Sequence, residues 1–229
     1  MSVKLQHLSR SFVEGEQKHQ IFTDLKLEIN TGEIIVLLGR SGSGKSTLLN
    51  LVSGIDRPDT GLVTISGTDI HSLSEHQRTL FRRQHIGFVF QFFNLISTLT
   101  VEENLLLPLE LNGLGGKAAS RKARGLLEDV GLQNRANTFP DLLSGGEQQR
   151  IAISRALIHD PELILADEPT GNLDKETGVQ VLDLLDTLVR RKQKTMIMAT
   201  HSREVIGMAD RILTFDAGNL IELNPREFG

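Results

Sequence analysis

The stretch Glu33–Ser46, EIIVLLGRSGSGKS, decides the fold of this chain. Its first part, Glu33–Leu38, is a continuous β-rich run of the kind found in strands that are buried on both faces. A glycine-rich turn follows, and from Lys45 to Gly54 the apolar residues recur at helical spacing. A strand, a glycine-rich turn and a helix in this order predict an α/β protein that binds phosphate at the turn.

Gly39–Ser46 matches the pattern G-x-x-x-x-G-K-[ST]. Its glycines let several backbone N–H groups converge on anionic oxygens, and the next helix adds its positive N-terminus. Lys45 supplies a mobile charge for β- and γ-phosphates, and Ser46 supplies a hydroxyl for Mg²⁺. A merely structural turn is the alternative, which the flanking strand and helix disfavour. The predicted phosphate-binding residues are Gly39, Arg40, Ser41, Gly42, Ser43, Gly44, Lys45, Ser46 and Thr47.

Composition narrows the function further. The 229 residues carry 25 Lys and Arg against 29 Asp and Glu, and this net charge of −4 argues against a nucleic-acid partner. No cysteine is present, which excludes disulfides and thiolate chemistry. The start of the chain lacks a secretory signal, and its apolar runs are too short to span a bilayer, so we expect a soluble, cytoplasmic protein.

The remaining pattern alternates strands and helices around a helical middle, which predicts a mostly parallel sheet. We expect one domain over residues 1–229, with an α/β core and an N-terminal antiparallel β-subdomain in 1–91 and 162–229. An α-helical subdomain is inserted over 92–161. The expected strands are 22–29, 33–38, 62–66, 86–90, 163–166, 195–200 and 211–216. The expected helices are 45–54, 117–130 and 174–192. Capping boxes predict the starts of two more helices, at Ser74 and Thr100.

Two adjacent acids follow the apolar run 163–166. Asp167 ends this strand, where a carboxylate can hold a phosphate-bound Mg²⁺. Glu168 comes next and points elsewhere, so that it can polarise an attacking water. An acidic pair after a strand is as often a turn and a helix cap, but the phosphate loop upstream favours the catalytic role.

The string Leu143–Arg150, LSGGEQQR, and the string Leu165–Asp174, LADEPTGNLD, complete a pattern with the phosphate loop. Together they resemble the ATP-binding-cassette (ABC) ATPases over nearly the whole chain. On its own, Ser144–Glu147 predicts a capping box, and a helix N-terminus opened by glycines is an anion site. The resemblance implies that two chains pair head to tail around two ATP molecules. It implies that each closes over its partner's ATP with Ser144, Gly145, Gly146 and Glu147.

The resemblance also implies roles for single residues. Gln91 matches the glutamine that, in this family, reaches Mg²⁺ and the attacking water. Without the resemblance, a lone glutamine at this position would be interpreted as a surface residue. His201 matches the histidine that contacts the γ-phosphate, although Ser202 follows it where Asp is common. Asp174 matches the loop that crosses the dimer interface, and it is equally a good N-cap. The implied metal ligands are then Ser46, Gln91 and Asp167, and the implied catalytic residues are Glu168, His201, Gln91 and Lys45.

The base-stacking position is unusual because the chain has ten Phe and neither Trp nor Tyr. Members of the family often carry Tyr after the first strand, and here Phe12 is the candidate for stacking on adenine. A core position for Phe12 is the alternative. Stacking predicts that Phe12→Ala weakens ATP binding by about 1–3 kcal/mol.

Phe88–Leu95, FVFQFFNL, and Thr170–Asp174 look most like the branch with the lipoprotein-release, macrolide-exporter and cell-division cassettes. This implies an ATP-hydrolysing motor subunit that uses ATP and Mg²⁺ and pairs with a second copy of itself. It also implies that the dimer drives an integral membrane permease subunit from the cytoplasmic face of the inner membrane. Phe92–Leu99 is the expected contact with that subunit, with core packing as the alternative. A non-transporting regulator of a membrane complex, as in cell division, remains open. A cassette acting on DNA or the ribosome is disfavoured by the acidic charge.

Overall fold

The computed structural model describes residues 3–15, 17–216 and 218–224. They form two compact units, the first made of Met1–Arg82 with Gln193–Gly229 and the second of Arg83–Lys192. The second unit includes the expected helical subdomain together with two strands and a further helix. The boundaries predicted at 91 and 162 stay a prediction.

The first unit contains an antiparallel sheet in the order β2-β1-β4-β5. In β2, Phe22, Leu25, Leu27 and Ile29 are buried, which confirms the expected strand with one wet face. The residue pattern predicts no bounds for β1, because register shifts around His7, whose φ is 53°, interrupt its alternation. The resemblance implies a first strand that ends before Phe12, whereas β1 includes Phe12. The strands are β1 (Val3–Glu14), β2 (Gln17–Ile29), β4 (Thr60–Ile65) and β5 (Thr68–Asp69).

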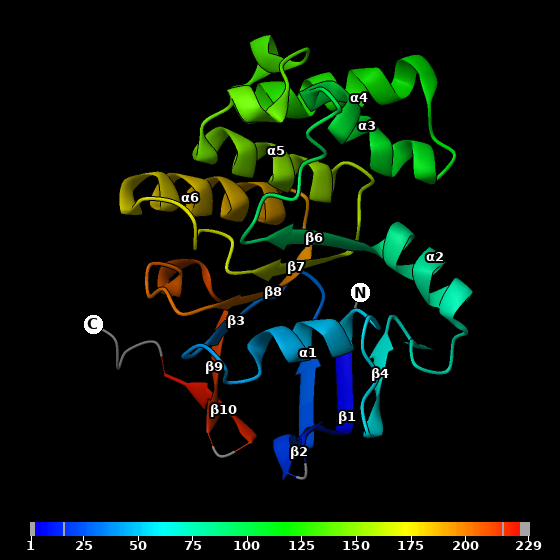
Figure 1. The fold of residues 1–229 in the computed structure, drawn as a ribbon, viewed down its shortest axis with the longest axis vertical. Coiled ribbons are helices and arrows are strands. Elements are labelled where there is room, and N and C mark those ends of the chain that lie inside the picture. Colours follow the sequence, from blue (N-terminus) through cyan, green and yellow to red (C-terminus); the bar gives the residue numbers. More distant parts are fainter. Residues whose placement is uncertain (1–2, 16, 217, 225–229) are drawn as a thin grey trace. The chain divides into compact units, whose positions relative to one another are not determined.

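A second set of strands in the first unit is mainly parallel (Figure 1). β3 (Ile34–Leu38) pairs in parallel with β8 (Thr195–Thr200) and with β9 (Arg211–Asp216), while β10 (Asn219–Leu223) runs antiparallel to β9. Every residue of β3 and β8 is buried. This confirms the burial predicted from the apolar run at 33–38 and the strand predicted at 195–200. The helix α1 (Lys45–Val52) follows β3.

In the second unit, β6 (Ile86–Phe90) pairs in parallel with β7 (Leu163–Asp167). The helices α3 (Val101–Leu111), α4 (Gly116–Asp129) and α5 (Gly145–Leu157) pack on one another, and α6 (Lys175–Arg191) packs on α5 (Figure 1). The predicted capping box at Thr100 opens α3.

The helix α2 (Glu75–His85) begins at the predicted capping box, in which Ser74 and Gln77 bond reciprocally. Short 3₁₀ turns lie at Gln133–Arg135, Pro140–Leu142 and Ile206–Met208. The antiparallel N-terminal sheet and the mainly parallel strands confirm the expected α/β class. Within the described ranges, we find no helix with the length and apolar character needed to cross a bilayer.

Candidate functional site

The phosphate loop occupies the turn between β3 and α1 in the first unit. The Lys45 Nζ donates hydrogen bonds to the carbonyl oxygens of Gly39, at 2.7 Å, and Arg40, at 2.9 Å, so the ammonium group folds back over the loop. Gly44 begins the helix with φ 98°, in the left-handed region. A Cβ there would lie 2.7 Å from the Ile21 side chain, so the loop requires glycine at this position on two counts.

The N-terminus of α1 is suited to an anion. Gly44 has no side chain with which to cap the helix, and the first turn holds no acidic residue in this described segment. The first N–H groups of an α-helix lack partners within the helix and carry a partial positive charge. Together with the Lys45 ammonium, they form a site whose chemistry fits a polyphosphate.

Two further predicted residues belong to the first unit. His201 directly follows β8, whose Thr200 pairs with Leu38 of β3, and the Thr200 carbonyl accepts a hydrogen bond of 3.2 Å from the Gly39 N–H. The histidine therefore follows the strand that lies beside the start of the phosphate loop. Phe12 lies in β1 and is 41% exposed, so it is not a core residue, and its ring remains accessible to a ligand.

The predicted acids lie in the second unit. Asp167 is the last residue of β7 and pairs with Phe90 at the end of β6, so Gln91 and Glu168 both follow the carboxyl ends of neighbouring parallel strands. Glu168 has φ 46°, which is uncommon for a residue other than glycine. This left-handed turn changes the direction of the chain directly after Asp167, in line with separate roles for the two carboxylates.

An unpredicted contact joins Gln91 to the loop after Glu168. The Gln91 Nε2 donates to the Asn172 Oδ1 at 3.2 Å, and the Asn172 Nδ2 donates to the Gln91 backbone carbonyl at 3.0 Å. Gly171 leaves room for this pair, because a Cβ there would lie 2.8 Å from the Gln91 Nε2. The reciprocal amide bonds hold Gln91 in place beside the acidic pair.

The signature string opens α5 with the predicted capping box. The Ser144 Oγ accepts a bond of 3.3 Å from the Glu147 N–H, and the Glu147 Oε2 accepts one of 2.9 Å from the Ser144 N–H. The bond from the Ser144 backbone N–H is the main reason that the pKa of the Glu147 carboxyl lies below its usual range. This contribution to stability is therefore present above the usual glutamate pKa and is lost as the pH falls through the lowered one.

The first turn of α5 packs against the first turn of α6. A Cβ at Gly146 would lie 2.5 Å from the Thr177 Cγ2, so glycine permits the close approach. Asp174 caps α6 by accepting a bond of 3.0 Å from the Thr177 N–H, which confirms its capping role. The structure therefore brings the signature residues and Asp174 together within the second unit.

A buried glutamine that the sequence did not single out connects these parts. Gln149 of α5 is fully buried, and its Nε2 donates to the Pro169 carbonyl at 2.6 Å and to the Phe90 carbonyl at 3.3 Å. The signature helix is thus fixed to the strand end before Gln91 and to the chain after Glu168. The position of Gln149 in the signature string was the only available signal.

The predicted magnesium ligands can be tested against the donor chemistry. Among the described residues, no group of three or more His, Cys, Asp or Glu side chains could hold a metal alone. Mg²⁺ prefers oxygen ligands and commonly combines one or two protein groups with phosphates and waters. The hydroxyl of Ser46 in the first unit, and the amide of Gln91 and the carboxylate of Asp167 in the second, are each oxygen donors of that kind.

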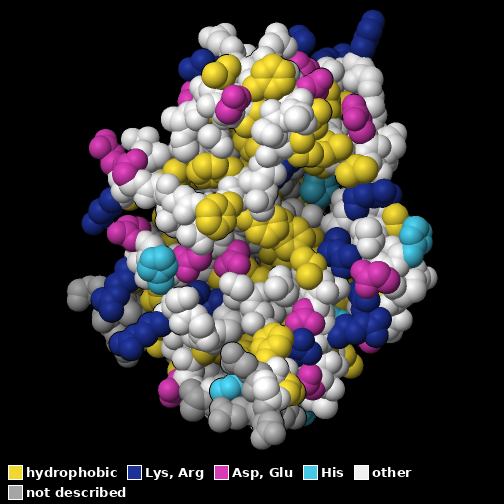
Figure 2. Space-filling model, in the orientation of Figure 1, with side chains coloured by type: hydrophobic (Ala, Val, Ile, Leu, Met, Phe, Trp, Pro, Cys, Tyr) yellow, Lys and Arg dark blue, Asp and Glu magenta, His cyan; other side chains and the backbone are white. Residues whose placement is uncertain are grey.

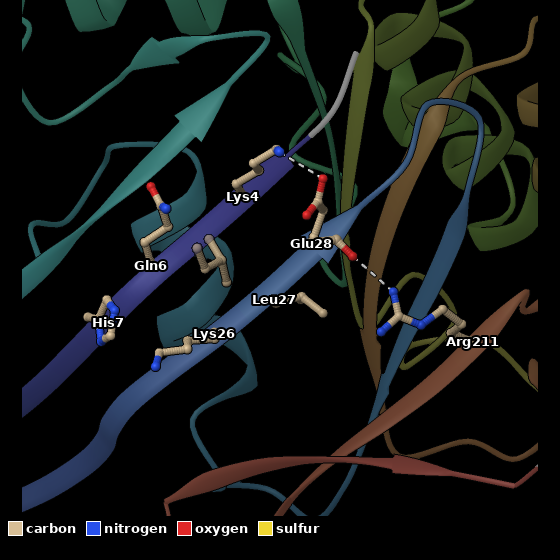
Figure 3. A pocket seen from close by; sticks show the side chains of 8 residues that line it. Lys4, Gln6, His7, Lys26, Leu27, Glu28 and Arg211 are labelled. Atoms are coloured by element: carbon tan, nitrogen blue, oxygen red, sulfur yellow. Dashed lines mark hydrogen bonds and ion pairs between the residues drawn. The ribbon is translucent and has the colours of Figure 1, made fainter.

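A separate hollow of about 510 Å³ lies in the first unit (Figure 3). Its cations are paired: Lys4 with Glu28 at 2.8 Å and Lys26 with Asp24 at 3.5 Å. Arg211 pairs with Glu222 and donates to the Glu28 carbonyl. The hollow therefore offers no surplus positive charge for a phosphate. Its lining residues are Lys4, Leu5, Gln6, His7, Lys26, Leu27, Glu28 and Arg211.

The strand, the glycine-rich anion loop and the capped signature helix define a P-loop protein of the ATP-binding-cassette type. Comparison with known proteins agrees, since residues 22–171 match the family model described as ABC transporter. The chain belongs to the ABC transporter family, as one of its ATP-binding cassettes.

Three relatives illustrate the similarity. An uncharacterised ABC transporter ATP-binding protein of Mycobacterium tuberculosis (strain CDC 1551 / Oshkosh) is 57% identical over 98% of this chain and 91% of its own length. The lipoprotein-releasing system ATP-binding protein LolD of Legionella pneumophila (strain Paris) is 42% identical over 94% and 95%. The ATP-binding cassette MJ0796, solved as a dimer bound to ADP and Pi, has a TM-score of 0.86 and 38% identity, covering 97% of this chain and 99% of that one.

Proposed function

We propose that this cassette is the ATP-hydrolysing motor of a membrane transporter, and that it works as a dimer around two Mg²⁺-ATP. The observation that carries the proposal is the presence in one chain of two different helix N-termini that a phosphate could approach, an uncapped one beside a cation at α1 and a capped one at α5. α1 adds the Lys45 ammonium to its N–H groups, and α5 presents the signature string. A chain that binds one triphosphate needs one such cradle, and the second suits the nucleotide of a partner copy. The dimeric structure of MJ0796 supports this arrangement.

In the proposed reaction, Lys45 and the loop N–H groups bind the β- and γ-phosphates of ATP. Glu168 accepts a hydrogen bond from the attacking water and orients it, with its backbone turned away from Asp167. His201 stabilises the charge on the γ-phosphate, and Ser46, Gln91 and Asp167 are the residues that would hold Mg²⁺. When bound, the metal neutralises charge on the phosphate oxygens.

The segment Phe92–Leu99 is the proposed contact with a membrane subunit. Its backbone is anchored: Arg155 donates to the carbonyl of Phe93, at 3.1 Å, and of Asn94, at 2.6 Å, and the buried Asn104 bonds to both backbone groups of Ile96.

Two apolar side chains of this segment nevertheless face solvent, Phe92 at 68% and Ile96 at 39% exposed, which argues against ordinary core packing. Figure 2 shows further hydrophobic side chains on the visible surface of the second unit, to which this segment belongs. A rigid backbone with exposed apolar side chains is suited to docking.

The likeness to LolD, a lipoprotein-releasing system ATP-binding protein, supports a membrane partner of the lipoprotein-releasing type. We further propose that the cassette lies on the cytoplasmic face of the inner membrane and transmits force to that partner. Differential binding of ATP and its products by the open and closed dimer would couple hydrolysis to movement.

Replacement of Glu168 tests the catalytic part. Glu168→Gln is expected to bind ATP with unchanged affinity, to lose at least about hundredfold in turnover, within the range for a general base, and to accumulate as a dimer with ATP. Phosphate release and sedimentation with ATP measure both effects. Glu110→Gln, at an exposed carboxylate of α3, is the matched control. Wild-type turnover in Glu168→Gln would remove the proposed role.

Replacement of Phe92 tests the docking segment. Phe92→Ser is expected to abolish co-purification with the membrane subunit while the isolated chain keeps its ATPase activity, because the side chain supports no core packing. Leu111→Ser is the control, since Leu111 is 53% exposed but lies at the end of α3. Equal loss of the membrane subunit in both variants, or in neither, would contradict docking at Phe92. Mass spectrometry of the captured subunit identifies the partner.

A further inference from the structure

Arg10 covers one face of the proposed base-stacking residue. Both residues lie in β1 two positions apart, on the same side of the strand. The Arg10 guanidinium carbon lies 4.6 Å from the centroid of the Phe12 ring, within the range of a cation–π contact. Phe12 is nonetheless 41% exposed, so the ring is covered on one side and accessible elsewhere.

A clamp of two carboxylates fixes the guanidinium. The Arg10 Nη2 donates to both Asp56 carboxylate oxygens, at 3.0 and 2.8 Å, and its Nη1 donates to Asp59 at 3.2 Å. Asp59 is held in turn by the backbone N–H of Ser11 at 2.8 Å and by the Ser11 hydroxyl at 2.5 Å. The Arg10 side chain is only 19% exposed, so these charge-assisted bonds act in a partly desolvated setting.

The two aspartates come from the connection between α1 and β4, the segment that leaves the phosphate-binding helix. The Asp59 N–H also donates to the Ser9 carbonyl at 2.9 Å, which adds a backbone bond between this connection and β1. One rigid cluster within the first unit thus joins the end of α1 to the strand that carries Phe12.

We propose that Arg10 is a positioning residue for the nucleobase. Held by Asp56 and Asp59, it fixes the Phe12 ring as a platform with one open face, against which adenine stacks. This inference rests on the proposed stacking role of Phe12. It adds that the orientation of the ring is set before ATP arrives, so that less side-chain freedom is lost on binding. It also explains how Phe, which has no hydroxyl to anchor it, can serve at this position.

The test compares ATP with inorganic tripolyphosphate, which needs the phosphate loop but has no base. Titration calorimetry on Arg10→Gln is expected to show ATP binding weakened about three- to tenfold, the size expected for ordering one side chain. Tripolyphosphate affinity is expected to stay unchanged. Phe12→Ala should weaken ATP binding about 5- to 150-fold, and Arg10→Gln added to Phe12→Ala should weaken it no further.

Other variants separate positioning from a loss of folding. Asp56→Asn keeps Arg10 and half of the clamp, and it should reproduce the Arg10→Gln effect in reduced form. Arg10→Lys keeps the cation but loses the planar fork, so its ATP affinity should lie between wild type and Arg10→Gln. Lys26→Gln, at an exposed cation of β2, is the control and should change neither affinity.

The absence of Trp and Tyr provides a direct view of the ring position. In Phe12→Trp, the introduced indole is the only one in the protein, and its fluorescence anisotropy without nucleotide reports its freedom. Adding Arg10→Gln should lower that anisotropy.

The outcomes are distinguishable. An Arg10→Gln variant that loses tripolyphosphate and ATP affinity equally, leaves anisotropy unchanged, or adds its full effect to Phe12→Ala would overturn the positioning role. Unchanged ATP affinity in Phe12→Ala would instead remove stacking itself.

Discussion

Glycines lie at the N-termini of both α1 and α5, yet the two helix ends are capped differently. At α1, Gly44 offers no cap, and the Lys45 ammonium folds over the loop at 2.7 and 2.9 Å from two carbonyl oxygens. At α5, Ser144 and Glu147 complete a reciprocal capping box within the chain. A helix end that has no side-chain cap and lies beside a cation is suited to an external anion, whereas a capping box supplies acceptors within the chain.

This difference indicates that the α1 end binds the triphosphate and that the α5 end contacts a nucleotide already bound by another chain. The α1 site has the charge to hold a triphosphate in a single chain. The α5 site brings a carboxylate, Glu147, which weakens its attraction for anions, so we expect it to add to a nucleotide that is already bound elsewhere. In a nucleotide-sandwich dimer, the α1 site of one chain binds ATP strongly and the α5 site of the other chain closes over it.

Lys45→Ala should have the largest effect on binding. It removes the charge-assisted hydrogen bonds that Lys45 is proposed to donate to the β- and γ-phosphates of ATP, worth about 1.5–3 kcal/mol each. Two such bonds predict at least about a hundredfold loss of ATP affinity in the isolated chain. Calorimetric titration measures this, with Lys117→Ala at the exposed start of α4 as the control. An ATP affinity within threefold of wild type would contradict the claim that the α1 site binds ATP through Lys45.

Ser144→Ala should have a smaller effect than Lys45→Ala, and it should appear in the free energy of unfolding and in ATP-dependent dimerisation. Losing the N-cap should cost about 0.5–2 kcal/mol in the free energy of unfolding, and ATP affinity of the single chain should not change. Thr100→Ala removes the same kind of capping box from α3, so it should cost similar stability. Only Ser144→Ala should also impair ATP-dependent dimerisation, and equal dimerisation in the two variants would leave Ser144 as a cap alone.

The parts predictable from sequence are those whose chemistry is local. β3 follows from a continuous apolar run, and the starts of α3 and α5 follow from capping boxes, because the interacting groups lie within four residues. The bounds of β1 do not follow from the sequence, because register shifts break its alternation. β10 was missed because it is short and largely exposed.

The candidate site divides in the same way. The phosphate loop, the acidic pair at the end of β7 and the signature string are each contiguous in sequence. Residue types predict phosphate binding by the loop and metal or water contacts by the acids, whereas the role of the signature string at a partner's nucleotide comes from the resemblance to the ABC ATPases. The bonds from Asn172 to Gln91, from Gln149 to Pro169 and from Arg10 to Asp56 join residues 20 to 81 positions apart. Such contacts depend on tertiary packing, and a single sequence carries no periodic signal for them.

The most direct test of the account is a mixing experiment in the Glu168→Gln background. A chain with Lys45→Ala cannot hold ATP in its own loop, and a chain with Ser144→Arg cannot close over a partner's ATP. Each alone should stay monomeric with ATP in analytical ultracentrifugation. The mixture has one intact site, made from the loop of the Ser144→Arg chain and the signature of the Lys45→Ala chain, and it should form a dimer. A mixture that stays monomeric, or a Ser144→Arg chain that dimerises alone, would contradict the sharing of nucleotide sites between two copies.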